Sequence, residues 1–145
     1  RLCMRNFLLI LFTSLIISGC TGTGLTTYGD YVRATKITEN SDVVVYRQPG
    51  FVGGGTIFTI TLNGAELGTI GNDEFLIGEM QEGRNILNVE VKGIQGFGLN
   101  KPTKTFEKTI EKNIYFKVGY SGGANAPTIF IQEISPQEFR RRAAN

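Results

Sequence analysis

The 145-residue sequence contains no histidine and no tryptophan, and it has only two cysteines, Cys3 and Cys20. The lack of histidine removes the commonest general base and the commonest nitrogen ligand for metal ions, so we expect no metal site. The only cysteine beyond the amino-terminal segment is Cys20, which therefore has no partner for a disulfide within the folded part.

Catalytic groups of other kinds are also scarce. Ser121 and Ser135 have no recognisable base beside them in the sequence. Asp73 and Glu74 are adjacent, and Glu79 and Glu82 flank an expected turn, but neither spacing dictates acid–base chemistry, so we interpret these carboxylates as solvated surface groups. We therefore predict that the protein is not an enzyme.

Residues 7–19 form a segment without charge that follows Met4, Arg5 and Asn6 and ends at Cys20. Met4 is the expected start of translation. A basic start, an apolar stretch and a small residue before a cleavage point are typical of a secretory signal. The apolar part, residues 7–17, is shorter than the ~20 residues of a spanning helix. A buried core helix or a retained short anchor are the alternatives, but no capping or amphipathic pattern supports them.

The four residues Ile17, Ser18, Gly19 and Cys20 resemble the lipobox of bacterial lipoproteins, in which an aliphatic residue and two small residues precede the modified cysteine. The resemblance implies a signal peptide over residues 1–19 and attachment of diacylglyceryl and acyl groups, such as palmitate, to Cys20. Two or more acyl chains hold a protein stably on a membrane. Thr21 follows in place of aspartate, which in a Gram-negative host implies the outer membrane, on its periplasmic face. No other cofactor is expected.

Removal of residues 1–19 takes away two of the 15 basic residues, which leaves 13 against 13 acidic residues. A neutral domain offers no electrostatic reason to expect nucleic acid as a partner. Residues 20–41 show little periodicity and are interpreted as a tether. About 20 residues of flexible chain span roughly 25 Å. We assign residues 42–145 to one folded domain.

Residues 42–134 alternate between apolar and polar side chains at period two, which predicts short β-strands. The Asn63-Gly64 pair predicts a type I′ hairpin turn. The expected strands are residues 43–47, 57–62, 66–70, 74–80, a strand with Leu87, Val89 and Val91 facing inward, residues 104–111, a strand with Ile114, Phe116, Val118 and Tyr120 on one face, and residues 128–134.

If each strand is antiparallel to the one before it, the connections fall alternately at two ends of the domain. Tight polar turns at residues 63–64, 81–84 and 112–113 share one end. The other end receives residues 48–55, 71–73, 93–103 and 121–127, of which three are long and rich in glycine. The tether enters at the tight-turn end, so we expect the glycine-rich loops to point away from the membrane.

The glycine-rich stretches at residues 53–55 and 93–98 lack the lysine and the following helix of a phosphate-binding loop. Phe51 and Phe97 lie in these two loops. Two interpretations remain open: each phenylalanine folds back to plug the core, or both form an exposed apolar contact for a partner.

Ser135, Pro136 and Glu138 form a capping-box pattern that predicts a short helix through Arg142. Arg140, Arg141 and Arg142 suit the carboxyl end of a helix. Attraction to anionic lipid head groups is the alternative interpretation of these arginines.

The stretches at residues 43–47, 62–68 and 82–89 resemble small bacterial lipoproteins that carry a β-sandwich domain without an established activity. We therefore expect an all-β fold: an antiparallel β-sandwich of about eight strands, of immunoglobulin- or prealbumin-like type, with a short C-terminal helix. The expected function is a lipid-anchored, non-catalytic envelope module that binds a protein or peptidoglycan through its glycine-rich loops. A carrier of a small apolar ligand inside a β-barrel cavity is the alternative, and an enzyme is the most distant one.

Overall fold

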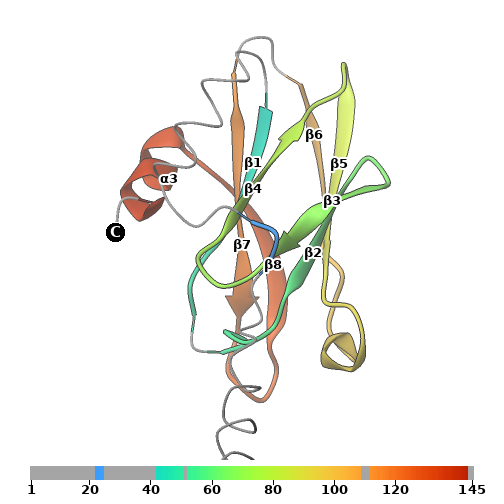
Figure 1. Cartoon of the computed structure of the whole chain (residues 1–145), viewed down its shortest axis with the longest axis vertical. Coiled ribbons are helices and arrows are strands. Elements are labelled where there is room, and N and C mark those ends of the chain that lie inside the picture. The colour runs from blue at the N-terminus through green and yellow to red at the C-terminus, as the bar shows by residue number, and fades with distance from the viewer. Residues whose placement is uncertain (1–21, 25–41, 51, 109–111, 144–145) are drawn as a thin grey trace, which may run out of the picture.

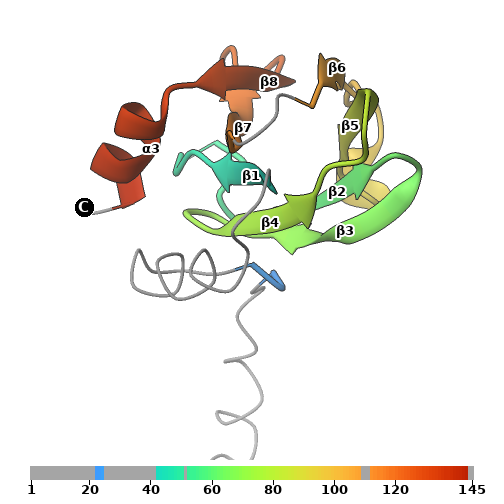
Figure 2. The ribbon, with the colours of Figure 1, turned by 90° about the horizontal axis from the view of Figure 1, so that it is seen from above.

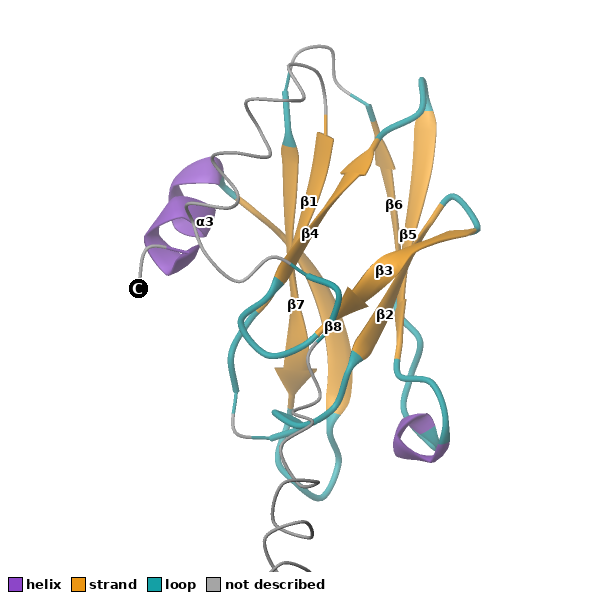
Figure 3. Cartoon of the chain, viewed as in Figure 1, coloured by secondary structure: helices purple, strands orange, loops and turns teal. Residues whose placement is uncertain are grey.

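The computed structural model describes residues 22–24, 42–50, 52–108 and 112–143, and these form eight strands, a short 3-10 turn and one helix (Figures 1 and 3). The elements are β1 (Asp42–Arg47), β2 (Phe58–Leu62), β3 (Ala65–Ile70), β4 (Phe75–Glu79), β5 (Arg84–Glu90), η1 (Ile94–Gly96), β6 (Thr103–Glu107), β7 (Ile114–Ser121), β8 (Thr128–Ile134) and α3 (Pro136–Ala143). The all-β fold with eight strands and a C-terminal helix is confirmed. Within the described residues, no helix has the length and apolarity needed to cross a bilayer.

The strands form two four-stranded sheets, with the orders β4-β1-β7-β8 and β3-β2-β5-β6. Seen from above, the two sheets lie as facing layers with the helix outside the first one (Figure 2). Every pair is antiparallel except β1 and β7, which run parallel from the Val43–Ile114 pair onward. This parallel pair agrees with strict alternation of strand direction along the chain, because the first and seventh strands then point the same way.

Because strand direction alternates along the chain, tight turns and long loops lie at opposite ends of the sandwich, as the sequence predicts. The tight β4–β5 turn lies at the top of the view in Figure 1, and the long β5–β6 and β7–β8 loops lie at the bottom. Asp42 pairs with Glu79, next to the β4–β5 turn, so β1 begins at the tight-turn end.

The core between the sheets is filled by inward-facing aliphatic and aromatic side chains. Leu87, Val89 and Val91 are buried as expected, and Phe116 and Val118 of β7 oppose them. Thr59 of β2 is also buried. β6 ends at Glu107, so the expected strand over residues 104–111 is shorter than predicted within the described chain.

The unbroken apolar run in β1 has a structural cause. Val43 and Val45 face the core between the sheets, whereas Val44 and Tyr46 face a second cluster beneath helix α3. Phe139 of this helix is fully buried there, with its ring centroid 6.0 Å from that of Tyr46. Because the helix covers the outer face of the sheet, both faces of β1 are apolar.

The sequence pattern at the start of α3 is confirmed in part. Ser135 Oγ accepts a hydrogen bond from the Glu138 N–H at 3.1 Å, as an N-cap does. The Glu138 carboxylate contacts Arg142 at 3.0 Å and Lys117 Nζ at 3.5 Å. The glutamate therefore ties the helix to itself and to β7.

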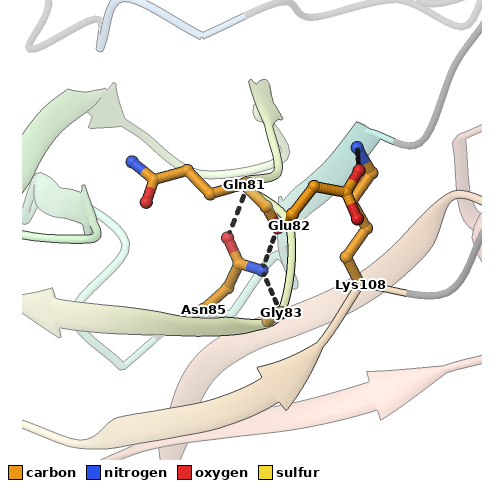
Figure 4. Close-up of polar contacts among 5 residues, drawn as sticks. All are labelled: Gln81, Glu82, Gly83, Asn85 and Lys108. Carbon is orange, nitrogen blue, oxygen red and sulfur yellow. Dashed lines mark hydrogen bonds and ion pairs between the residues drawn. The ribbon is translucent and has the colours of Figure 1, made fainter.

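The two tight turns at one end are built on asparagines. Asn63 and Gly64 have φ values of 52° and 82°, the left-handed geometry that a type I′ turn requires. Asn85, fully buried, bonds the Gln81 N–H and the Gln81 and Gly83 carbonyls at 2.9–3.0 Å (Figure 4). Beside this turn, Lys108 Nζ forms an ion pair with the Glu82 carboxylate at 2.8 Å (Figure 4).

Candidate functional site

The β1–β2, β3–β4 and β7–β8 connections meet in a small cavity at the loop end of the sandwich. Its volume is about 210 Å³. The Gly50 N–H donates to Asn72 Oδ1 at 3.0 Å, so the β1–β2 loop and the β3–β4 turn are joined there. The lining side chains and backbone come from Arg47, Gln48, Pro49, Gly50, Val52, Asn72, Tyr120 and Gly122.

Arg47, at the end of β1, is 1% exposed and forms one wall of this cavity. Its Nη1 donates to the carbonyls of Thr56 and, at 3.3 Å, of Ile70. Its Nη2 donates to the Gly53 carbonyl at 2.6 Å and to Thr56 Oγ1 at 3.3 Å. The four bonds use both terminal nitrogens of the guanidinium, so this cation fixes the loop and does not offer its fork to an anion.

The environment of Arg47 is apolar on one side and carbonyl-lined on the other. The guanidinium carbon lies 4.2 Å from the ring centroid of Phe58. Burial lowers the pKa of Arg47 from its usual value, while Tyr120 and Glu74 act in the opposite direction. The guanidinium is the most basic of the protein side chains, so we treat Arg47 as a cation.

Gly53 is required at its position in this loop. Its φ of +69° is a conformation that side chains with a Cβ rarely adopt. A Cβ placed there would lie 2.1 Å from the Tyr120 ring. The Tyr120 hydroxyl also lies 3.1 Å from Thr56 Oγ1, so β7 and the β1–β2 loop are in direct contact.

The carboxylates near the loop end have structural partners. Tyr46 donates to Asp73 Oδ1 at 2.8 Å, and burial together with this bond and the charge of Asp73 raises the pKa of Tyr46. Glu74, interpreted from the sequence as a solvated surface group, is instead buried, and its carboxylate accepts the Gly71 N–H at 2.7 Å. The described part of the chain contains no cluster of three or more histidine, cysteine, aspartate or glutamate side chains suited to a metal ion.

A second feature of the loop end is the apolar tip formed by Ile94 and Phe97, which are 95% and 93% exposed. Successive 3.1 Å backbone bonds, from Gly96 to Gly93 and from Phe97 to Ile94, hold the turn. Asn100 bonds both backbone groups of Ile129 at 2.7–2.8 Å and so attaches the base of this loop to β8. The tip therefore presents two apolar side chains from a braced backbone.

The short segment of residues 22–24 lies against the open edge of β3. The Thr23 N–H donates to the Thr69 carbonyl at 2.8 Å, and the Thr69 N–H donates to Thr23 Oγ1 at 2.9 Å. Gly22 adjoins Gly71 and Glu74, since a Cβ there would lie 2.6 Å from the Gly71 nitrogen. These two Thr23–Thr69 hydrogen bonds, which we call the Thr23 clamp, lie where β3 enters the Gly71–Asp73 connection.

The Thr23 clamp argues against the expected orientation of the tether. The chain begins β1 at the tight-turn end, but the segment three residues after Cys20 lies toward the loop end. The N–H and the carbonyl of Thr69 point outward from the β3 edge strand, where no further strand of the described chain pairs with them. Thr23 forms a hydrogen bond with each of these two groups, which explains its placement.

The site residues predicted from the sequence divide into two groups. Phe97 is exposed and does not plug the core, whereas contact with a partner stays a prediction. The remaining ones lie outside the described residues: Ile17, Ser18, Gly19, Cys20 and Phe51.

Sequence reasoning missed the roles of Arg47, Ile94 and Thr23. A cation that ends an apolar strand and precedes three glycines is a usable signal for a loop-fixing arginine. Comparison with protein families, with curated proteins and with solved structures finds no match for this chain.

Proposed function

We propose that the protein is a lipid-anchored, non-catalytic module of the bacterial cell envelope, held at the outer membrane through acylated Cys20. The module binds a protein or peptidoglycan partner through the loops at its glycine-rich end. The observation that supports this proposal is the construction of that end, where the buried Arg47 fixes the β1–β2 loop by four hydrogen bonds. Loops held in one conformation lose less entropy when a partner binds.

The filled core favours this module over a carrier of an apolar ligand. Phe58, Ile60 and Phe116 are fully buried between the sheets. The loop-end cavity of about 210 Å³ has Arg47, Asn72 and Tyr120 in its lining, and it is smaller than the ~300–1,000 Å³ of typical ligand pockets.

Two experiments test the proposal in a Gram-negative host that makes the full chain. Intact mass spectrometry of the membrane fraction is expected to show a cleaved leader and acyl groups on Cys20. The Cys20→Ser variant is expected to leave the membrane fraction. An unmodified thiol in the parent protein contradicts the anchor.

The partner is sought with a photo-crosslinking residue at Val52, which lines the loop-end cavity. The matched control carries the same residue at Ala65, the exposed first residue of β3 directly after the tight β2–β3 turn. A defined envelope protein or peptidoglycan fragment captured from position 52 and not from position 65 is the expected result. A lipid-like molecule that co-purifies with the unlabelled protein supports the carrier instead.

A further inference from the structure

The Thr23 clamp limits how far the domain stands from its proposed lipid. Thr23 lies three positions after Cys20. Three steps of extended chain span at most about 11 Å. Without the clamp, the whole tether over residues 20–41 would set this distance. The clamp therefore replaces a long tether by a very short one.

The position of the clamp also selects the end of the sandwich that faces the lipid. Thr69 is the penultimate residue of β3, and the next connection, residues 71–73, contacts the β1–β2 loop through Asn72. That loop and the apolar tip both belong to the glycine-rich end of the fold (Figure 1). The clamp and the apolar tip therefore lie toward the same end of the domain.

The sequence around the apolar tip has the charge that suits a phospholipid surface. No acidic residue occurs between Glu90 and Glu107, and this stretch contains Lys92, Lys101 and Lys104. Lys92 and Lys101 pair with Glu66 and Glu90 at 2.6 Å and 2.9 Å, so the charges at the base of the loop are balanced. The tip itself carries no charge: Ile94 and Phe97 are exposed on either side of the neutral Gln95. A short, braced tip that carries two exposed apolar side chains and no charge of its own suits the boundary between head groups and acyl chains.

We infer that the occupant of the apolar tip is the bilayer that carries the Cys20 lipid, with Ile94 and Phe97 inserted at its surface. This inference depends on the proposed acylation of Cys20 and names the partner of one loop of the proposed module. The glycine-rich end then faces the membrane, opposite to the expectation from the sequence. Arg140 and Arg141 of α3 are exposed on the outer side of the first sheet and take no part in the proposed contact.

The test uses the full chain made in a Gram-negative host and reconstituted into vesicles of phosphatidylethanolamine and phosphatidylglycerol. Phe97→Cys carries an environment-sensitive fluorophore, and Ala65→Cys, at the exposed first residue of β3 beside the tight β2–β3 turn, is the matched control. At position 97 we expect a blue shift of emission and loss of fluorescence when the lipids carry a nitroxide quencher. At position 65 we expect neither.

A third sample tests the role of the clamp. Thr23→Val in the Phe97→Cys background removes the hydroxyl that accepts the Thr69 N–H. We expect recovery of part of the fluorescence lost at position 97, because the domain is then held less closely.

Each outcome has a distinct meaning, since the intact mass of the same samples reports the state of Cys20. An acylated protein that shows no quenching at position 97, or stronger quenching at position 65, overturns the inference and leaves the anchor intact. An unacylated Cys20, which would itself take up the label, contradicts the lipid anchor of the proposed function, and with it the inference that depends on that anchor.

Discussion

The Asn63 amide nitrogen donates a 2.8 Å hydrogen bond to Asn85 Oδ1, which links the β2–β3 turn to the β4–β5 turn. Asn63 Oδ1 in turn accepts the Ile86 N–H at 2.8 Å. The two asparagines thus connect a hairpin turn, between β2 and β3, to the turn by which the chain passes from one sheet to the other, between β4 and β5.

Replacing Asn85 is therefore expected to weaken the fold strongly. Asn85→Ala leaves the turn at residues 81–83 without its side-chain partners, and an unsatisfied buried polar group costs ~1–3 kcal/mol. Asn88→Ala is the matched control, because the hydrogen bond that the Asn88 side chain accepts from Thr103 Oγ1 is exposed to solvent. Urea unfolding followed by circular dichroism measures both, and equal midpoints for the two variants contradict the assignment.

Gly53 and Gly55 offer a comparison within one loop. Gly53→Ala forces a Cβ into a left-handed conformation and toward the Tyr120 ring, so we expect destabilisation by about 1–3 kcal/mol. Gly55→Ala meets no atom within 4 Å and needs no positive φ, and we expect little change. Thermal melts of the two variants decide the point, and a Gly53→Ala protein as stable as Gly55→Ala refutes it.

The charge of Arg47 alone is not expected to preserve the loop end. Arg47→Lys keeps a cation but loses the planar fork that reaches Gly53, Thr56 and Ile70. We expect the free energy of unfolding to fall by about 2–3 kcal/mol, because a hydrogen bond to a charged group contributes ~1.5–3 kcal/mol. Arg84→Lys, at an exposed position of β5, serves as the control in the same denaturant series. A tolerated Arg47→Lys variant would show that the fork is dispensable.

Helix α3 should loosen in acid. The hydrogen bond from Arg142, together with the charge of Lys117, lowers the pKa of Glu138 below its usual value of 4.5. A lowered folded-state pKa contributes stability above the unfolded pKa, and this contribution is lost as the pH falls through the folded pKa. Glu138→Gln is therefore expected to flatten the stability profile below about pH 4.5. Chemical denaturation between neutral pH and pH 3 measures it, and parallel profiles would contradict the assignment.

Most of the fold was predictable because its signals are local. The period-two pattern located all eight strands, Asn63-Gly64 located a hairpin with the required positive φ values, and Ser135 located the helix start. Strand order, in contrast, depends on pairs such as Val43 with Ile114, which are 71 positions apart. No local preference encodes such a pairing.

The candidate site was less predictable for the same reason. Phe97 was identified with two opposite interpretations, and only its 93% exposure separated them. Arg47 looked like an ordinary strand residue, because its bonds to Gly53, Thr56 and Ile70 exist only after the two sheets meet.

The sequence by itself determined which segments become strands, where the turns fall and how the connections divide between two ends, because these follow from side-chain alternation and turn chemistry. Only the tertiary structure decided that Arg47 is buried under the β1–β2 loop and that Thr23 bonds the edge of β3. Both depend on backbone groups of distant residues, which a linear pattern of side chains does not reveal.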